Sequence, residues 1–231
     1  MPDLFIVGDS MTRGYFGIPY TPLLTLPFKT RGYDGATLTT AAENAAKVLR
    51  REKGILLLLA GANDLLAHLY HSMGGAGRHE LVTAPVEDID IWIQRARNAL
   101  EPLRDAFTLV LSTIPVIYRS SIPLFNELLN RYDEAIRSLS NTIGAPLIDL
   151  GSALRAVQES TDSTYFPPSK ASLAKDAEFL HTQENAEEIL KRERGLTLSV
   201  DGIHLDSTAS VLVAQRIDGF FHQTLHVSDT F

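Results

Sequence analysis

Short apolar runs alternate with longer stretches of helical periodicity along this chain. Continuous apolar runs of this length are typical of parallel strands that are covered on both faces. The clear runs are residues 4–7, 55–60, 108–114 and 146–150, and a weaker run covers residues 26–32. We therefore predict a strand at each of these places.

Helical patterns fill most of the intervals between the runs. The first is rich in Ala and ends in basic residues, and the second has Pro and acidic residues in its first turns, as helix ends prefer. The predicted helices are residues 36–52, 84–106, 122–143 and 207–225. This alternation predicts one α/β domain over residues 1–231, in three layers and with right-handed crossovers.

Two segments exceed the minimum that this plan needs. Residues 67–83 are rich in Gly and His, and residues 155–198 form a long, polar, partly helical insertion. Long insertions in such folds are often lids or binding loops. The alternative is a surface excursion with an amphipathic helix lying on the core, and the sequence favours neither.

Aromatic and histidine residues inside these segments have a structural and a functional interpretation. An aromatic and proline stretch of the insertion either lines an acyl pocket or packs the insertion onto the core, and we favour packing. It consists of Tyr165, Phe166, Pro167 and Pro168. The histidines His68, His71 and His79 lack the carboxylate pattern of a zinc site, so we predict no metal there.

The composition excludes several classes of protein. The net charge is -7 without a basic block, which argues against nucleic acid or an anionic membrane as the main partner. No apolar run approaches the roughly 18 residues of a membrane span, and no secretory leader is recognisable. Cysteine is absent, which excludes disulfides and thiolate metal sites. We expect a cytoplasmic protein without a cofactor.

Four short motifs follow the predicted strands or precede the last helix. Ser10 follows the first apolar run, Gly35 the second, and Asn63 the third, while Asp201 and His204 precede the helix of residues 207–225. Ligands of an open parallel sheet bind outside the carboxyl ends of its strands. The first three motifs are therefore expected to meet at one edge, and the fourth joins them if its loop lies there too.

Together these residues supply the groups that acyl transfer needs. Ser10 is a nucleophile if a base takes its proton, and a neutral imidazole such as His204 is the natural base near neutral pH. Asp201, three residues earlier, is placed to fix the imidazole tautomer. The oxyanion donors would be the backbone N–H groups of Ser10 and Gly35 and the side-chain amide of Asn63.

Each residue also has a structural interpretation. Ser10 alone is better read as a helix cap, and Gly35 as a turn. Asn63 and Asp64 could cap the helix that follows them, and the Asp-Gly step that begins at Asp201 favours a turn. The joint occurrence of all four motifs, in this order and at strand ends, favours the catalytic interpretation.

The motifs resemble the conserved blocks of the SGNH, or GDSL-type, serine hydrolase superfamily. The matching stretches are Gly-Asp-Ser at residues 8–10, Gly-Ala-Asn-Asp at 61–64, Asp-Gly-Ile-His at 201–204 and, least specifically, residues 32–37. The resemblance implies a flavodoxin-like α/β/α sandwich around a five-stranded parallel sheet. It also implies a Ser10, His204 and Asp201 triad with the same oxyanion donors.

The resemblance assigns two further acidic residues, Asp9 and Asp64, to structural roles in loops near the site. We read a third, Asp206, as a cap for the last helix.

The favoured hypothesis is a metal-independent esterase that forms an acyl-enzyme on Ser10 with a small-molecule ester. An acyltransferase using the same site, a metal-dependent phosphoesterase and a non-catalytic binding module are the alternatives. The phosphoesterase is disfavoured because no Asp-x-His follows the first strand and no close pair of histidines ends the chain.

Overall fold

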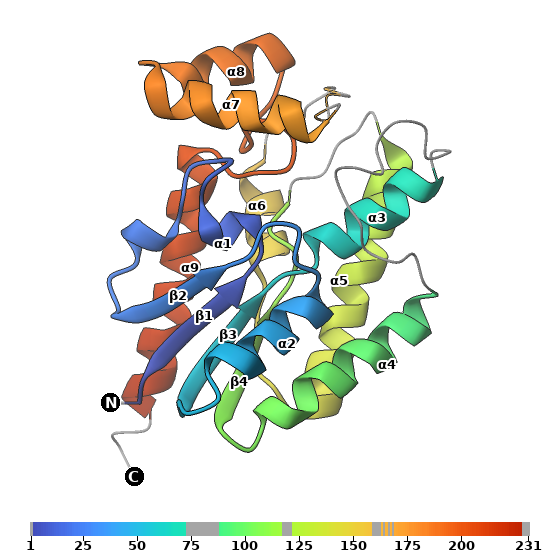
Figure 1. Ribbon diagram of the computed structural model, residues 1–231, viewed down its shortest axis with the longest axis vertical. Coiled ribbons are helices and arrows are strands. Elements are labelled where there is room, and N and C mark those ends of the chain that lie inside the picture. The colour runs from blue at the N-terminus through green and yellow to red at the C-terminus, as the bar shows by residue number, and fades with distance from the viewer. Residues whose placement is uncertain are drawn as a thin grey trace.

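The computed structural model describes residues 2–72, 88–116, 122–158, 163, 165, 167 and 169–227. These residues form a five-stranded sheet in which every neighbouring pair of strands is parallel (Figure 1). Its strands, in the spatial order β2-β1-β3-β4-β5, are β1 (Leu4–Gly8), β2 (Phe28–Gly32), β3 (Gly54–Leu59), β4 (Phe107–Ser112) and β5 (Leu147–Ile148). The predicted sheet and its flavodoxin-like strand order are confirmed.

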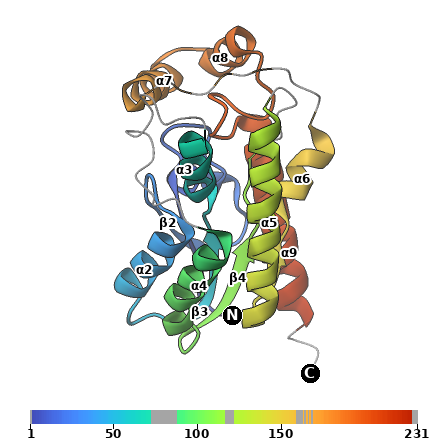
Figure 2. The same ribbon diagram turned by 90° about the vertical axis from the view of Figure 1, so that its right-hand side faces the viewer.

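Helices separate the strands and cover both faces of the sheet, which confirms the three predicted layers (Figure 2). The α-helices are α1 (Ser10–Arg13), α2 (Leu38–Val48), α3 (Ala62–Ser72), α4 (Ile89–Leu100), α5 (Pro123–Ile143), α6 (Leu150–Val157), α7 (Lys170–Thr182), α8 (Ala186–Arg194) and α9 (Ser207–Val227). Short 3₁₀ turns add η1 (Thr21–Leu23) and η2 (Glu101–Leu103). On one face α4 packs between α2 and α5, and on the other α6 packs on α9.

Burial explains which strands gave a clear sequence signal. Every residue of β1 is buried, and four consecutive residues of β3 are buried, so both read as continuous apolar runs. β2 lies at the sheet edge and alternates between half-buried and exposed residues, which explains its weaker pattern. β5 is shorter than the predicted residues 146–150, because Asp149 leaves the strand and caps α6 by accepting the Ser152 N–H at 3.2 Å.

Local capping also sets the helix bounds. α2 begins two residues later than predicted because Thr37 caps it, with Thr40 completing a capping box. α4 begins after its cap Asp88 and runs into η2, which contains Pro102, so it is shorter than the predicted residues 84–106. Residues 84–87 of that prediction lie outside the described part. The helix expected at 207–225 is present, and Asp206 caps it by accepting the Ala209 N–H at 2.8 Å.

The described part of the insertion contains a pair of helices, α7 and α8, above the sheet (Figure 1). Figure 1 shows α7 and α8 beyond the carboxyl ends of the strands, at the end of the molecule opposite the chain termini. The His181 ring on α7 contacts the Tyr15 carbonyl oxygen, 3.0 Å from its Nε2 atom. The insertion therefore covers the edge where the sequence motifs were expected to meet. Within the described ranges, no helix is long and apolar enough to cross a membrane.

Two buried carboxylates hold the loops that leave this edge. Asp9 caps α1 by accepting the Met11 N–H at 2.9 Å. Asp64, in the first turn of α3, accepts the Leu38 N–H at 2.9 Å and the Trp92 indole N–H at 2.7 Å. Asp64 thus joins the start of α2 to α4 through one side chain. Burial raises the pKa of Asp64 to about 6, against the opposing effect of these hydrogen bonds.

Gly32 provides the first test of this packing. An added Cβ would lie 2.1 Å from the Arg13 backbone nitrogen, so Gly32→Ala must push β2 and α1 apart. We expect it to lower the free energy of unfolding by about 1–3 kcal/mol, measured by urea denaturation. Gly219→Ala in α9 is the control, because an added Cβ meets no atom within 4 Å. It should raise stability by about 0.5–1 kcal/mol, and equal losses in both variants would contradict the packing argument.

Asp9 gives a test by pH. Burial raises the pKa of its carboxyl from 3.8 to about 7, although the Met11 N–H opposes this. Between those values the folded chain holds a proton that the unfolded chain has lost, so stability falls as pH rises from about 4 to about 7. Asp9→Asn should remove roughly 2–4 kcal/mol of that fall in urea titrations at several pH values. Asp105→Asn on the surface is the control, and an unchanged slope in Asp9→Asn would refute the prediction.

Candidate active site

Ser10 is presented at the edge of the sheet by the short turn that follows β1. Asp9, rather than Ser10, supplies the cap of α1, and Gly14 ends the helix in the left-handed conformation. The interpretation of Ser10 as a helix cap is therefore wrong. Its hydroxyl lies 2.9 Å from Nε2 of His204, and the residue is 8% exposed.

A tight turn positions the histidine opposite this serine. The Oδ1 atom of Asp201 accepts the backbone N–H groups of Ile203 at 2.8 Å and His204 at 2.7 Å. The same carboxylate uses Oδ2 to contact the imidazole, 2.6 Å from Nδ1 of His204. The turn and catalytic interpretations of this segment are thus compatible, because the turn brings the imidazole ring onto the carboxylate.

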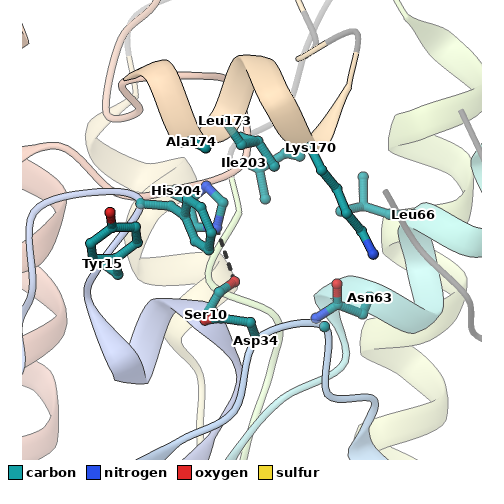
Figure 3. Close-up of a pocket in the computed structure, with 12 residues that line it drawn as sticks. Ser10, Tyr15, Asp34, Asn63, Leu66, Lys170, Leu173, Ala174, Ile203 and His204 are labelled. Atoms are coloured by element: carbon teal, nitrogen blue, oxygen red, sulfur yellow. Dashed lines mark hydrogen bonds between the residues drawn. The ribbon is translucent and has the colours of Figure 1, made fainter. Parts of the chain in front are cut away.

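Ser10, His204 and Asp201 form one line of hydrogen bonds across 194 residues of sequence. Figure 3 shows the His204 ring directly above the Ser10 hydroxyl. Asp201 is fully buried and His204 is 3% exposed, so water competes little with either contact. The Phe16 ring covers the imidazole, with its centroid 5.3 Å away. This arrangement lets Nε2 accept the serine proton while the carboxylate holds Nδ1–H.

The electrostatics of the pair match this arrangement. Burial opposes the charged form of His204, but the Asp201 carboxylate, together with Asp9 and Asp34, outweighs burial and raises the pKa of the imidazole. Burial likewise opposes ionisation of Asp201, yet the imidazole and the backbone N–H donors lower the pKa of its carboxyl. Asp201 therefore remains ionised and stabilises positive charge on the ring.

Gly35 and Asn63 lie beside Ser10 on the wall of one pocket. Gly35 follows β2 with a φ of 74°, a conformation that favours glycine, and Asn63 lies in the first turn of α3 after β3. The Asn63 amide donates one N–H to the Ala36 carbonyl at 3.0 Å, which fixes the side chain and leaves its second N–H. Asn63 is within α3 and does not cap it.

The pocket has a volume of about 430 Å³ and is walled mainly by apolar side chains. Its described lining residues are Ser10, Tyr15, Phe16, Asp34, Gly35, Asn63, Leu66, Lys170, Leu173, Ala174, Ile203 and His204. Helix α7 of the insertion supplies Lys170, Leu173 and Ala174, so this helix forms the roof (Figure 3). The sequence pattern does not single out these residues, although it marks their segment as unusually long.

The aromatic stretch of the insertion contributes differently. Tyr165 packs under the guanidinium of Arg194, 4.3 Å from its ring centroid, and is not among the lining residues. Pro167 is buried. Neither residue is among the pocket-lining residues, and the Tyr165 contact lies within the insertion itself. Phe166 and Pro168 lie outside the described residues.

The described histidines of residues 67–83 form no metal centre. His68 packs edge-on against the Tyr132 ring, and His71 is exposed at the end of α3. In the described ranges, no group of three or more His, Cys, Asp or Glu side chains is arranged to hold a metal ion. His79 is not among the described residues.

No protein-family model matches the chain, and no curated protein matches it significantly. Its structure is nevertheless similar to several solved ones. A lipase/acylhydrolase from Enterococcus faecalis aligns with a TM-score of 0.62 and 15% identity, over 97% of each chain. A member of the lipolytic G-D-S-L family from Veillonella parvula aligns with a TM-score of 0.60 and 14% identity, over 96% of this chain and 98% of that one.

A third similar structure is the psychrotrophic esterase EstA from Pseudoalteromonas. It aligns with a TM-score of 0.58 and 13% identity, over 98% of this chain and all (100%) of that one. All three alignments run through both the sheet and the insertion, since they cover nearly the whole chain. The chain therefore has the fold of the GDSL-type lipases and acylhydrolases.

Proposed function

We propose that this protein is a member of the SGNH hydrolase superfamily that hydrolyses carboxylic esters through an acyl-enzyme on Ser10. The observation that carries the proposal is the line of hydrogen bonds from Ser10 to His204 to Asp201, which opens into an apolar pocket. A serine, an imidazole and a carboxylate in this order are the parts of a nucleophilic triad.

In the first half-reaction Ser10 Oγ attacks the ester carbonyl carbon while His204 Nε2 takes the hydroxyl proton. The carbonyl oxygen becomes an oxyanion, and Asp201 stabilises the imidazolium that forms. When the tetrahedral intermediate collapses, the imidazolium gives its proton to the departing alcohol. The acyl group then remains on Ser10 as an ester.

Water completes the cycle by the same route. His204 takes a proton from a water molecule as the water attacks the acyl carbon, and it returns the proton to Ser10 Oγ. His204 must be neutral at the start of each half-reaction. The imidazole is neutral when the pH lies above its raised pKa. The products are a carboxylic acid and free enzyme.

The oxyanion would be held by three donors from three different strand ends. We assign the backbone N–H groups of Ser10 and Gly35 and the second N–H of the Asn63 amide. The placement of all three residues on the pocket wall supports this assignment. The Ala36 carbonyl holds the Asn63 amide in place before substrate arrives, so little reorganisation is needed during the reaction.

Covalent labelling tests the nucleophile. The esterase EstA, which has the same fold, is described as inhibited by monoethylphosphonate. We expect a fluorophosphonate probe to label this protein, seen as a mass increase on the Ser10 peptide. Ser10→Ala should not be labelled, with Ser152→Ala, on α6, as the control. Labelling that survives in Ser10→Ala would refute the assignment.

Turnover tests the base and the metal alternative. His204→Ala should reduce kcat for a short-chain ester by about a thousandfold or more, because nucleophile and base act as a unit. Activity should be unchanged in EDTA, whereas a two-metal phosphoesterase would lose its activity there. Near-normal turnover by His204→Ala, with intact folding by circular dichroism, would contradict the mechanism.

Asp201→Asn tests the electrostatics of the pair. The asparagine Oδ1 can keep the two backbone hydrogen bonds, but its amide N–H₂ favours the imidazole tautomer whose Nε2 carries the proton. We expect kcat to fall by about a hundredfold or more. Loss of the carboxylate also lowers the His204 pKa, so the acid limb of the kcat/KM profile should move to lower pH. A limb that stays in place would show that Asp201 does not control the imidazole.

A further inference from the structure

Lys170, the first residue of α7, brings a positive charge to a pocket that is otherwise largely apolar. It lines the pocket together with Leu66, Leu173 and Ile203. Figure 3 shows its side chain extending from the roof down toward Asn63, with the ammonium group at the end nearest the pocket floor. Lys170 is exposed to solvent, yet its ammonium group is directed toward the pocket rather than away from it (Figure 3).

The ammonium group has no protein anion to neutralise it. In the part of the chain that the structure describes, the Lys170 side chain has no hydrogen-bond or ion-pair partner. The other charged groups at the pocket are already paired: Asp34 with Arg13, and His204 with Asp201. A substrate anion would therefore meet Lys170 as the one uncompensated charge among the described lining residues.

The position of Lys170 relative to the triad decides which part of an ester would reach it. The alcohol oxygen of the ester must face His204 Nε2, because that nitrogen gives it a proton. Lys170 lies on the other side of the pocket, beside Leu66 and above Asn63 (Figure 3). With the alcohol directed at His204 and the carbonyl oxygen at the oxyanion donors, the acyl part would extend along the apolar wall on the Lys170 side of the pocket.

We propose that Lys170 selects esters whose acyl group carries an anionic end, such as the half-esters of dicarboxylic acids. This inference rests on the proposed esterase function and names its substrate class. The apolar side chains would contact the methylene groups of the acyl chain, and the ammonium group would bind the carboxylate at its end by a charge-assisted hydrogen bond. Lys170 would thus determine specificity without taking part in the bond-breaking steps.

Paired substrates with acyl chains of equal carbon number test this. We would measure kcat/KM for monoethyl glutarate and for its neutral counterpart ethyl valerate, with wild type and Lys170→Gln. The substitution should lower kcat/KM for monoethyl glutarate by about fivefold, the effect of an ion pair that is partly open to water. The value for ethyl valerate should stay within about twofold of wild type. Lys175→Gln, exposed on the same helix and outside the pocket lining, should change neither.

Further measurements establish which side of the ester carries the charge that Lys170 binds. Acetoxyacetate carries its carboxylate on the alcohol side, so Lys170→Gln should affect its hydrolysis no more than that of ethyl acetate, its neutral counterpart of equal carbon number. The wild-type preference for the glutarate half-ester should weaken as sodium chloride rises from about 0.05 M to about 0.5 M, because salt screens the ion pair. Lys170→Glu should invert the preference.

The failures of the two proposals are distinguishable. If wild type neither reacts with a fluorophosphonate nor hydrolyses ethyl valerate, the esterase function itself fails. If it does both, but Lys170→Gln changes kcat/KM equally for charged and neutral esters or not at all, the specificity inference alone is overturned. A loss confined to acetoxyacetate would likewise overturn it, because the lysine would then face the alcohol.

Discussion

The reversal of strand order at β1 is the constraint on which the site depends. β1 lies between β2 and β3. After β1 the chain forms β2 on one side of it, and then crosses back to form β3, β4 and β5 on the other side. Parallel strands open a crevice at such a point. The turn after β1 carries Ser10, and the loops after β2 and β3 carry Gly35 and Asn63. The hydrogen bond to His204 then fastens the start of the last helix to the same crevice.

This centre could be predicted from the sequence because each of its parts has a recognisable local pattern. β1 and β3 are buried on both faces, so each is an unbroken apolar run in the sequence. A polar residue that directly follows such a run is easy to recognise. The turn from Asp201 to His204 is set by hydrogen bonds within four residues, so its spacing already implies the contact between carboxylate and ring. The rule that parallel strands end at one edge places Ser10, Gly35 and Asn63 together, whereas Asp201 and His204 were expected to join them only if their loop lies at the same edge.

The helix that forms the roof of the pocket has no such recognisable pattern in the sequence. α7 alternates small, polar and apolar residues without a strong apolar face, and its place depends on contacts with distant segments, such as that between His181 and the Tyr15 carbonyl. Tyr15 and Phe16 follow Ser10 closely, yet nothing in their spacing marks them as pocket residues. The edge strand β2 gave a weaker pattern because alternate residues are exposed to water. The bounds predicted for β5 were too long because Asp149 caps α6 instead of continuing the strand.

The charge at the pocket also shows why the net charge of a chain does not determine which ligands its pocket can favour. A chain with a net charge of -7 would be expected to repel anions. Screening by salt limits that repulsion to about 8–10 Å, so a ligand in the pocket responds mainly to the charges that line it. There Asp34 is paired with Arg13, whereas the Lys170 ammonium is free of protein partners within the described chain. The local field can thus favour an anion even though the average field of the protein opposes it.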